Sequence, residues 1–145
     1  MGKKQRSIKS KRNNRGFTLI ELLVVIVILA AIAGIVGPRL FKKLGKAKTG
    51  TARTQIAQIE SALDSFRLDT GSYPTTSQGL AALEKDPGVD GWDGPYLKKA
   101  VPKDPWDNPY VYVYPGTHGE YDLSSYGQDG QPGGTGENAD INSWE

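Results

Sequence analysis

Hydrophobic and polar positions are distributed very unevenly along this chain. Residues 17–38 are almost entirely apolar, whereas the segments on either side carry most of the basic side chains. Further along, apolar residues recur at spacings of three and four, at Ile56, Ile59, Leu63 and Phe66. This spacing is typical of one face of an amphipathic helix. The pattern predicts one long helix over residues 17–70, of which only the second half has a face that a small domain covers.

The apolar run is long enough to cross a bilayer, which takes about 20 residues in a helix. Its only charged side chain is Glu21, just inside the front edge. A charge within a membrane is costly, so such a residue is expected to have a function and a partner. No Lys or Arg follows one helical turn later, so the partner must be another chain or a newly made amino terminus. A cleaved secretory signal peptide and a plain single-span anchor are alternatives, but both leave Glu21 without a role.

The sequence predicts one weak point within this helix and the position of its end. Gly34, Gly37 and Pro38 mark a weak point, and Pro38 favours a kink or local melting because it lacks an amide donor. Gly71 is the expected residue after the helix end, since the Tyr-Pro that follows it cannot continue a helix.

The remainder of the chain predicts short elements joined by loops. Residues 73–85 predict a turn and a short helix that begins at Thr76 or Ser77 and directs Leu80 and Leu83 inward. Residues 87–109 are rich in Pro, Gly and Asp and predict a long ordered loop, with packing anchors at Trp92, Tyr96 and Trp106.

A hairpin is predicted next. Residues 110–114 and 120–125 have the composition of strands, and residues 115–119 form the turn between them. The Gly-rich acidic tail is too polar to fold alone, yet Ile141 and Trp144 near its end indicate that it is pinned to the domain.

Charge is segregated along the chain. The net charge of +2 combines seven bases in residues 1–16, six bases and no acid in residues 39–53, and an excess of ten acidic groups in residues 54–145. The first basic segment is typical of a topology determinant, and the second could lie among anionic headgroups. Neither has the features of a nucleic-acid patch. The absence of Cys excludes a disulfide framework and any Cys-ligated metal site.

Catalytic patterns are weak. His118 is the only histidine and falls in the predicted hairpin turn, where it is expected to face solvent. Asp104 and Asp107 flank Trp106 in a Pro-rich loop, where carboxylates more often form turns than acid–base pairs. No serine-hydrolase, metalloprotease or phosphate-loop pattern is present, so we predict that the chain is not an enzyme.

The C-terminal loop contains oxygen ligands on flexible backbone. Asp129, Glu137, Asn138 and Asp140 lie among glycines, a composition that suits Ca²⁺, which takes six to eight oxygens. The loop lacks the spacing of a helix-loop-helix calcium site, and composition alone favours a solvated acidic tail over a metal site.

The hexapeptide GFTLIE at residues 16–21 resembles the prepilin cleavage motif of type IV pilins and type II secretion pseudopilins. The resemblance implies that a prepilin peptidase cuts between Gly16 and Phe17 and methylates the new amino terminus of Phe17. It also implies that the ammonium group of Phe17 in one subunit meets Glu21 of another. A buried carboxylate with a partner is tolerable, whereas one without is costly.

Four further segments, YPTTSQGL, WDGPYL, DPWDNPY and YDLSSYGQDG, together with the tail GGTGENADINSW, are similar to the major pseudopilin (G subunit) family of type II secretion. This family replaces the C-terminal disulfide of many pilins with Ca²⁺. Carried over by motif, the ligands are the side chains of Asp129 and Asp140 and the backbone carbonyl of Tyr126, with Asn138 and Ser125 as further candidates. Tyr126 stands where the family often has Leu, a change that a backbone ligand survives.

The resemblance therefore implies an α+β, pilin-like fold with a long N-terminal helix, a small antiparallel sheet and a calcium-ordered C-terminal loop. Residues 1–16 are the cleaved leader, residues 17–38 the transmembrane and assembly segment, in which Glu21 and Pro38 serve assembly, and residues 39–145 a periplasmic domain. The expected function is a structural inner-membrane subunit that polymerises into a pseudopilus. Its expected partners are copies of itself, minor pseudopilins, the inner-membrane assembly platform and prepilin peptidase. A type IV pilin for adhesion, motility or DNA uptake is the main alternative. A minor tip subunit, which would be expected to depart from the motif at Glu21, and a membrane-tethered enzyme are the two others.

Overall fold

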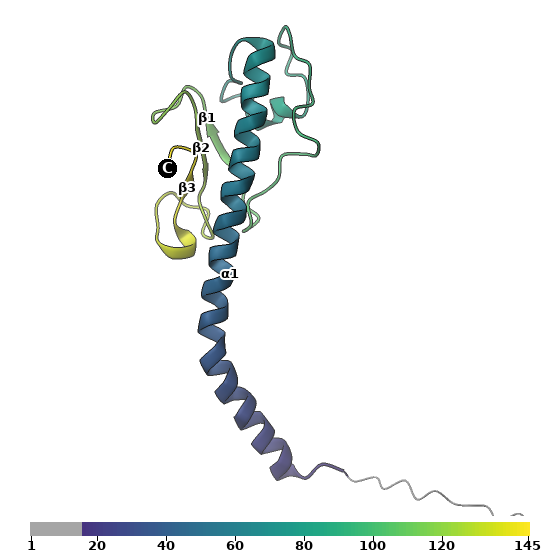
Figure 1. Cartoon of the computed structure of the whole chain (residues 1–145), viewed down its shortest axis with the longest axis vertical. Helices are drawn as coiled ribbons and strands as arrows, with labels where there is room; N and C mark the ends of the chain where they lie inside the picture. Colours follow the sequence, from purple (N-terminus) through teal and green to yellow (C-terminus); the bar gives the residue numbers. More distant parts are fainter. Residues whose placement is uncertain (1–15) are drawn as a thin grey trace, which may run out of the picture. The chain divides into compact units, whose positions relative to one another are not determined.

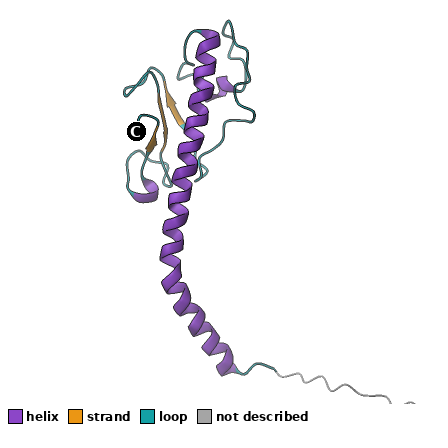
Figure 2. Ribbon diagram, viewed as in Figure 1, coloured by secondary structure: helices purple, strands orange, loops and turns teal. Residues whose placement is uncertain are grey.

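The computed structural model describes residues 16–145, and residues 1–15 of the predicted leader lie outside the described residues. The chain divides into two compact units, the first ending at Arg39 and the second comprising Leu40–Glu145. The element order is α1 (Leu19–Thr70), η1 (Leu80–Leu83), β1 (Val111–Val113), β2 (Asp122–Ser125), η2 (Gly136–Asn138) and β3 (Ile141–Asn142). The one α-helix of the described residues thus precedes all three strands along the chain, as the predicted α+β class requires, and the other helical elements are short 3₁₀ turns (Figure 2).

Helix α1 confirms the long helix predicted from the spacing of apolar residues. It continues through Pro38, so the local melting expected at that position is absent from the described helix. It ends where Gly71 adopts a φ of 86° and donates its amide to the carbonyl of Arg67 at 2.8 Å. Glycine suits this position because side chains are strained in the left-handed region.

The core of the second unit lies between the second half of α1 and the sheet (Figure 1). The helix contributes the predicted stripe, with Ile59 and Leu63 fully buried and Phe66 almost so. From outside the helix, Leu83, Leu123 and Ile141 are also buried. A sheet this small cannot form a core by itself, so the apolar face of α1 is what stabilises it.

The sheet has three antiparallel strands in the order β1-β2-β3. The first two form the predicted hairpin, with Tyr112 opposite Leu123. The third strand was not predicted: it is only two residues long, and Ser125 pairs with Ile141. Pinning of the tail at Ile141 is confirmed, because this side chain is 3% exposed.

The segment between helix and hairpin differs from the prediction at one point. The short helix exists as the 3₁₀ turn η1 with Leu80 and Leu83 buried, but Gly79 precedes it and no side chain caps it. The residue that bonds the turn is Thr75 rather than Thr76 or Ser77, because Thr75 and Gln78 exchange backbone-to-side-chain hydrogen bonds. This reciprocal pair closes the turn over residues 75–78, and Gly79 is the residue from which η1 begins.

The long loop over residues 87–109 is irregular and ordered by aromatic packing, as expected. Trp92, Tyr96 and Trp106 are half-buried and pack against the core. Tyr96 meets Phe66 of α1 edge to face, with ring centroids 5.6 Å apart, and the indole of Trp92 donates to the carbonyl of Ala82. The loop is therefore part of the domain rather than a free connection.

Candidate functional site

The predicted processing site is exposed. Gly16 has no atom within 4 Å of the place where a side chain would begin, and Phe17 is 90% exposed. Nothing in the fold therefore requires glycine at position 16, and the peptide bond between these residues is accessible to an enzyme.

Glu21 takes part in an arrangement that the prediction missed. The Oε2 atom of Glu21 accepts hydrogen bonds from the Thr18 amide at 2.9 Å and the Thr18 hydroxyl at 3.0 Å. In return, the Glu21 amide donates to the Thr18 hydroxyl at 3.2 Å. This is a capping box, which the spacing Thr-x-x-Glu ahead of an apolar run signals in the sequence. Glu21 therefore has a partner within its own chain at the helix start.

The apolar segment that follows has the length and composition of a membrane span, and none of its most hydrophobic stretch is buried in the protein. Its large side chains are all about half exposed or more, among them Ile20, Leu22, Leu29 and Ile35. Pro38 lies within the helix and is exposed as well. A soluble domain rarely exposes so long an apolar surface without a partner, so this surface must be covered by lipid or by other chains.

The C-terminal loop, residues 126–140, leaves the sheet between β2 and β3. Because Ser125 pairs with Ile141, Tyr126 and Asp140 are the first residues beyond the ladder on the two sides. The amide of Gln128 bonds the carbonyl of Glu137 at 2.8 Å, which holds the two stems of the loop side by side. Tyr126, Asn138 and Asp140 of the predicted ligand set are therefore brought to one end of the sheet.

Gly127 makes this close approach possible. It adopts a φ of 65°, and a Cβ atom there would lie 2.6 Å from the carbonyl oxygen of Glu137 and 2.9 Å from that of Ala139. Both the backbone conformation and the missing side chain are needed, so glycine is the residue that fits.

The two predicted carboxylate ligands differ in their surroundings. Asp140 accepts a hydrogen bond from the Gly133 amide through Oδ2 at 2.8 Å, while its Oδ1 is buried without a hydrogen-bond partner. Asp129 is exposed and accepts from the Gln131 amide at 3.1 Å. Within the described residues no three acidic, His or Cys side chains converge, so a metal here would need backbone and amide oxygens. A buried carboxylate oxygen without a donor fits a hard cation better than an apolar environment.

A buried network that the sequence did not predict holds the start of this loop. Ser125 donates its hydroxyl to Oδ2 of Asp104 at 2.6 Å, and Asp104 also accepts from the amides of Trp106 and Asn108. The expectation that Asp104 serves a turn is thus confirmed. The Asn108 side chain then bonds the carbonyl of Gly127 at 2.8 Å. Because the Ser125 hydroxyl already bonds Asp104, it is a weaker candidate for metal binding than the backbone carbonyls around it.

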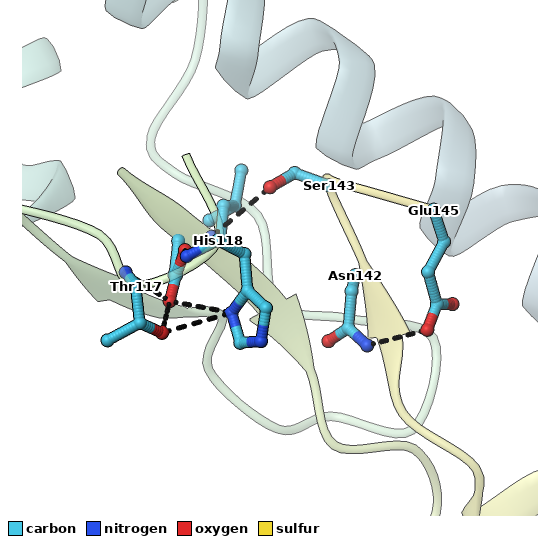
Figure 3. Close-up of polar contacts among 7 residues, drawn as sticks. Thr117, His118, Asn142, Ser143 and Glu145 are labelled. Carbon is cyan, nitrogen blue, oxygen red and sulfur yellow. Dashed lines mark hydrogen bonds and ion pairs between the residues drawn. The ribbon is translucent and has the colours of Figure 1, made fainter. Parts of the chain in front are cut away.

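The hairpin turn and the C-terminus meet at a second polar cluster (Figure 3). His118 is exposed, as expected, and bonds Asp122 at 3.1 Å. Burial alone would raise the pKa of Asp122, but hydrogen bonds from Thr117 and His118 outweigh it and hold that pKa well below its usual range. Trp144 stacks on His118 with ring centroids 4.1 Å apart. The expected pinning of Trp144 therefore occurs through a ring stack, with 37% of this residue still exposed.

Known proteins resemble the chain over almost its whole length. The family model described as type II secretion system (T2SS), protein G, matches residues 39–144, and the prokaryotic N-terminal methylation motif matches residues 11–37. Proteins named type II secretion system core protein G are similar. The one from Pseudomonas aeruginosa is 47% identical over 93% of this chain and 98% of its own. The one from Vibrio cholerae is 45% identical over 94% and 96%, respectively.

A solved structure is similar as well. The crystal structure of the major pseudopilin from the type 2 secretion system of enterohaemorrhagic Escherichia coli matches with a TM-score of 0.63 and 34% identity. The match covers 74% of this chain and 95% of that one.

Proposed function

The chain belongs to the type II secretion system protein G family, and on that premise we propose that it is the major pseudopilin, whose copies polymerise into the pseudopilus that drives protein export. The observation that carries this function is the combination of two matches in one chain: the protein G model over residues 39–144 and the methylation motif over residues 11–37. The type IV pilin alternative shares only the second of these. The role is structural rather than catalytic.

Processing comes first in the proposed sequence of events. Prepilin peptidase cuts the exposed peptide bond after Gly16 and methylates Phe17. The segment from Phe17 to Pro38 then remains in the inner membrane as a single span, with residues 39–145 in the periplasm. The exposed apolar surface of this segment supports the assignment. In the single subunit lipid would cover this surface, and in the filament the helices of neighbouring subunits would cover it.

Assembly requires Glu21 to exchange partners. In the single chain, its carboxylate is satisfied by the Thr18 cap. When the helix packs among other helices, the ammonium group of Phe17 in a neighbouring subunit supplies the opposite charge. The pair holds one register between subunits, because a shift of one turn would leave a carboxylate buried without a partner. Pro38, which lacks an amide donor, marks the point where the helix adjusts on entry into the filament.

The C-terminal loop is proposed to bind Ca²⁺. The residues that would hold the ion are Asp129 and Asp140 through carboxylates, Tyr126 through its carbonyl and Asn138 through its amide oxygen. The unpartnered Oδ1 of Asp140 and the juxtaposed loop stems support this set. A bound cation would supply the cross-link that the chain, which has no Cys, cannot obtain from a disulfide. Minor pseudopilins and the inner-membrane assembly platform are the further proposed partners.

Purification from membranes, followed by intact mass measurement and N-terminal sequencing, tests the processing proposal. We expect a chain that begins at Phe17 and carries one additional methyl group. A chain that begins after residue 38 would be a secreted soluble protein and would overturn both the anchor and the filament. Electron microscopy of sheared cells that overproduce the secretion system then tests polymerisation directly.

A further inference from the structure

One face of α1 in the second unit carries a stripe of basic side chains. Lys42, Lys43, Lys46 and Arg53 are all exposed, and at 3.6 residues per turn they fall within an arc of about 100°. Between Glu21 and Glu60 the sequence contains no acidic residue. The stripe therefore has no carboxylate on its own helix within reach to neutralise it.

The rest of the domain leaves the stripe charged. The ion pairs among the described residues involve Arg67, Lys103 and His118, and none includes a member of the stripe. Glu137 is the one acidic side chain that lines the cavity beside Lys42 and Lys46, and it packs over Gly45 of the same helix. Lys48 lies on a different face, with its ammonium group 5.9 Å from the ring of Trp106. The stripe thus offers several positive charges against one negative neighbour.

Apolar side chains lie next to the stripe on the same turns. Leu40, Phe41 and Leu44 are between 51% and 68% exposed and fall on a different face from the lysines, since neighbouring positions on a helix are 100° apart. A helix with a basic face and exposed large apolar side chains beside it is typical of a segment that lies in a membrane interface. No contact within the described part of the second unit buries these three side chains.

We propose that the first three members of this stripe, Lys42, Lys43 and Lys46, bind the anionic headgroups of phospholipids on the surface where α1 leaves the membrane. The inference rests on the proposed function, in which residues 17–38 span the bilayer and the domain lies outside the cytoplasm. On that side the positive-inside rule disfavours basic residues close to a span, so a cluster of six bases directly after it, at residues 39–53, needs a compensating interaction. Phosphate groups supply one, and each Lys or Arg near an anionic surface strengthens the preference for it by about fivefold.

The consequence for the filament is direct. A subunit held by headgroups sits at a defined depth in the membrane, and its stripe must release those headgroups when the helix is drawn out. Anionic lipid therefore opposes the extraction of single subunits from the membrane. The residues responsible are separate from Glu21, whose pairing with Phe17 sets the register between subunits.

The test uses the full processed chain in nanodiscs that contain equal amounts of phosphatidylglycerol and phosphatidylcholine. Native mass spectrometry counts each lipid retained on the protein. The variant Lys42→Gln/Lys43→Gln/Lys46→Gln removes three charges from the stripe, and the control Lys85→Gln/Lys98→Gln/Lys99→Gln removes three exposed charges from elsewhere in the domain. We expect wild type and control to retain phosphatidylglycerol preferentially, and the stripe variant to lose up to about a hundredfold of this preference.

Equal preference in wild type and stripe variant would overturn the proposal. Inorganic phosphate added to the wild type distinguishes the source of the ligand: displacement of phosphatidylglycerol by millimolar phosphate would show a free-anion site and overturn binding to the membrane surface. A chain that enters nanodiscs without any lipid preference contradicts only this inference. A chain that does not enter nanodiscs contradicts the membrane anchor of the proposed function itself.

Discussion

The two roles of Glu21 can be separated by two substitutions. Glu21→Gln removes the charge but keeps an amide oxygen that accepts the hydrogen bonds from Thr18. Thr18→Ala removes the hydroxyl that caps the helix and keeps the carboxylate. If the carboxylate pairs with the amino terminus of a neighbouring subunit, Glu21→Gln should block filament formation and Thr18→Ala should change it only slightly.

The expected magnitudes differ enough to decide between the roles. Loss of a Thr cap costs about 1 kcal/mol, which at Thr18 changes an assembly equilibrium by at most roughly fivefold. Removal of one partner from a buried ion pair leaves the other charge without a partner and corresponds to a loss of about 10²- to 10³-fold.

The assay measures sheared filaments by immunoblotting and electron microscopy, with membrane insertion checked by carbonate extraction and processing checked by intact mass. Both variants should insert and be cleaved like the wild type. Filaments at wild-type level from Glu21→Gln, combined with few or none from Thr18→Ala, would refute the pairing argument and leave the capping box as the reason for Glu21.

Three further predictions concern the domain and are measured in detergent. Gly127→Ala should lower the free energy of unfolding by about 2–4 kcal/mol, because the added Cβ atom clashes with a carbonyl oxygen and the backbone is in the left-handed region. The control is Gly133→Ala: Gly133 has a φ of 94° but open space around it, so the loss should be only about 1–2 kcal/mol. Equal losses in the two variants would contradict the close approach of the loop stems at Gly127. The depressed pKa of Asp122 adds stability that is complete above about pH 5 and is lost as the pH falls below about 4, so Asp122→Asn should flatten this acid dependence in urea titrations carried out with EGTA. Addition of Ca²⁺ should raise the melting temperature of the wild type but not that of Asp140→Asn. The control variant Asp86→Asn, which changes an exposed carboxylate, should respond like the wild type. An undiminished rise in Asp140→Asn would exclude Asp140 as a ligand.

Local patterns were sufficient for the helix. Its extent, its buried stripe at Ile59, Leu63 and Phe66, and its end before Gly71 all follow from spacings of a few residues and from the backbone freedom of glycine. The capping box was also visible locally, as Thr18 followed three residues later by Glu21. The box was not predicted, because a carboxylate in an apolar segment was expected to pair with a cation rather than with the neutral donors of Thr18.

The sequence by itself therefore determined the long helix, the apolar segment, the hairpin and the family, because each depends on periodicity or on a contiguous motif. Only the tertiary structure decided which distant segments meet. Strand β3 pairs with β2, the Asp104 carboxylate accepts a hydrogen bond from the Ser125 hydroxyl, and the Trp144 ring stacks on the His118 ring. These contacts join residues about 16 to 26 positions apart through loops rich in Gly and Pro. Such loops have no periodicity that predicts their path, and the path is set by burial of Ile141 and by hydrogen bonds between residues that are far apart in the sequence.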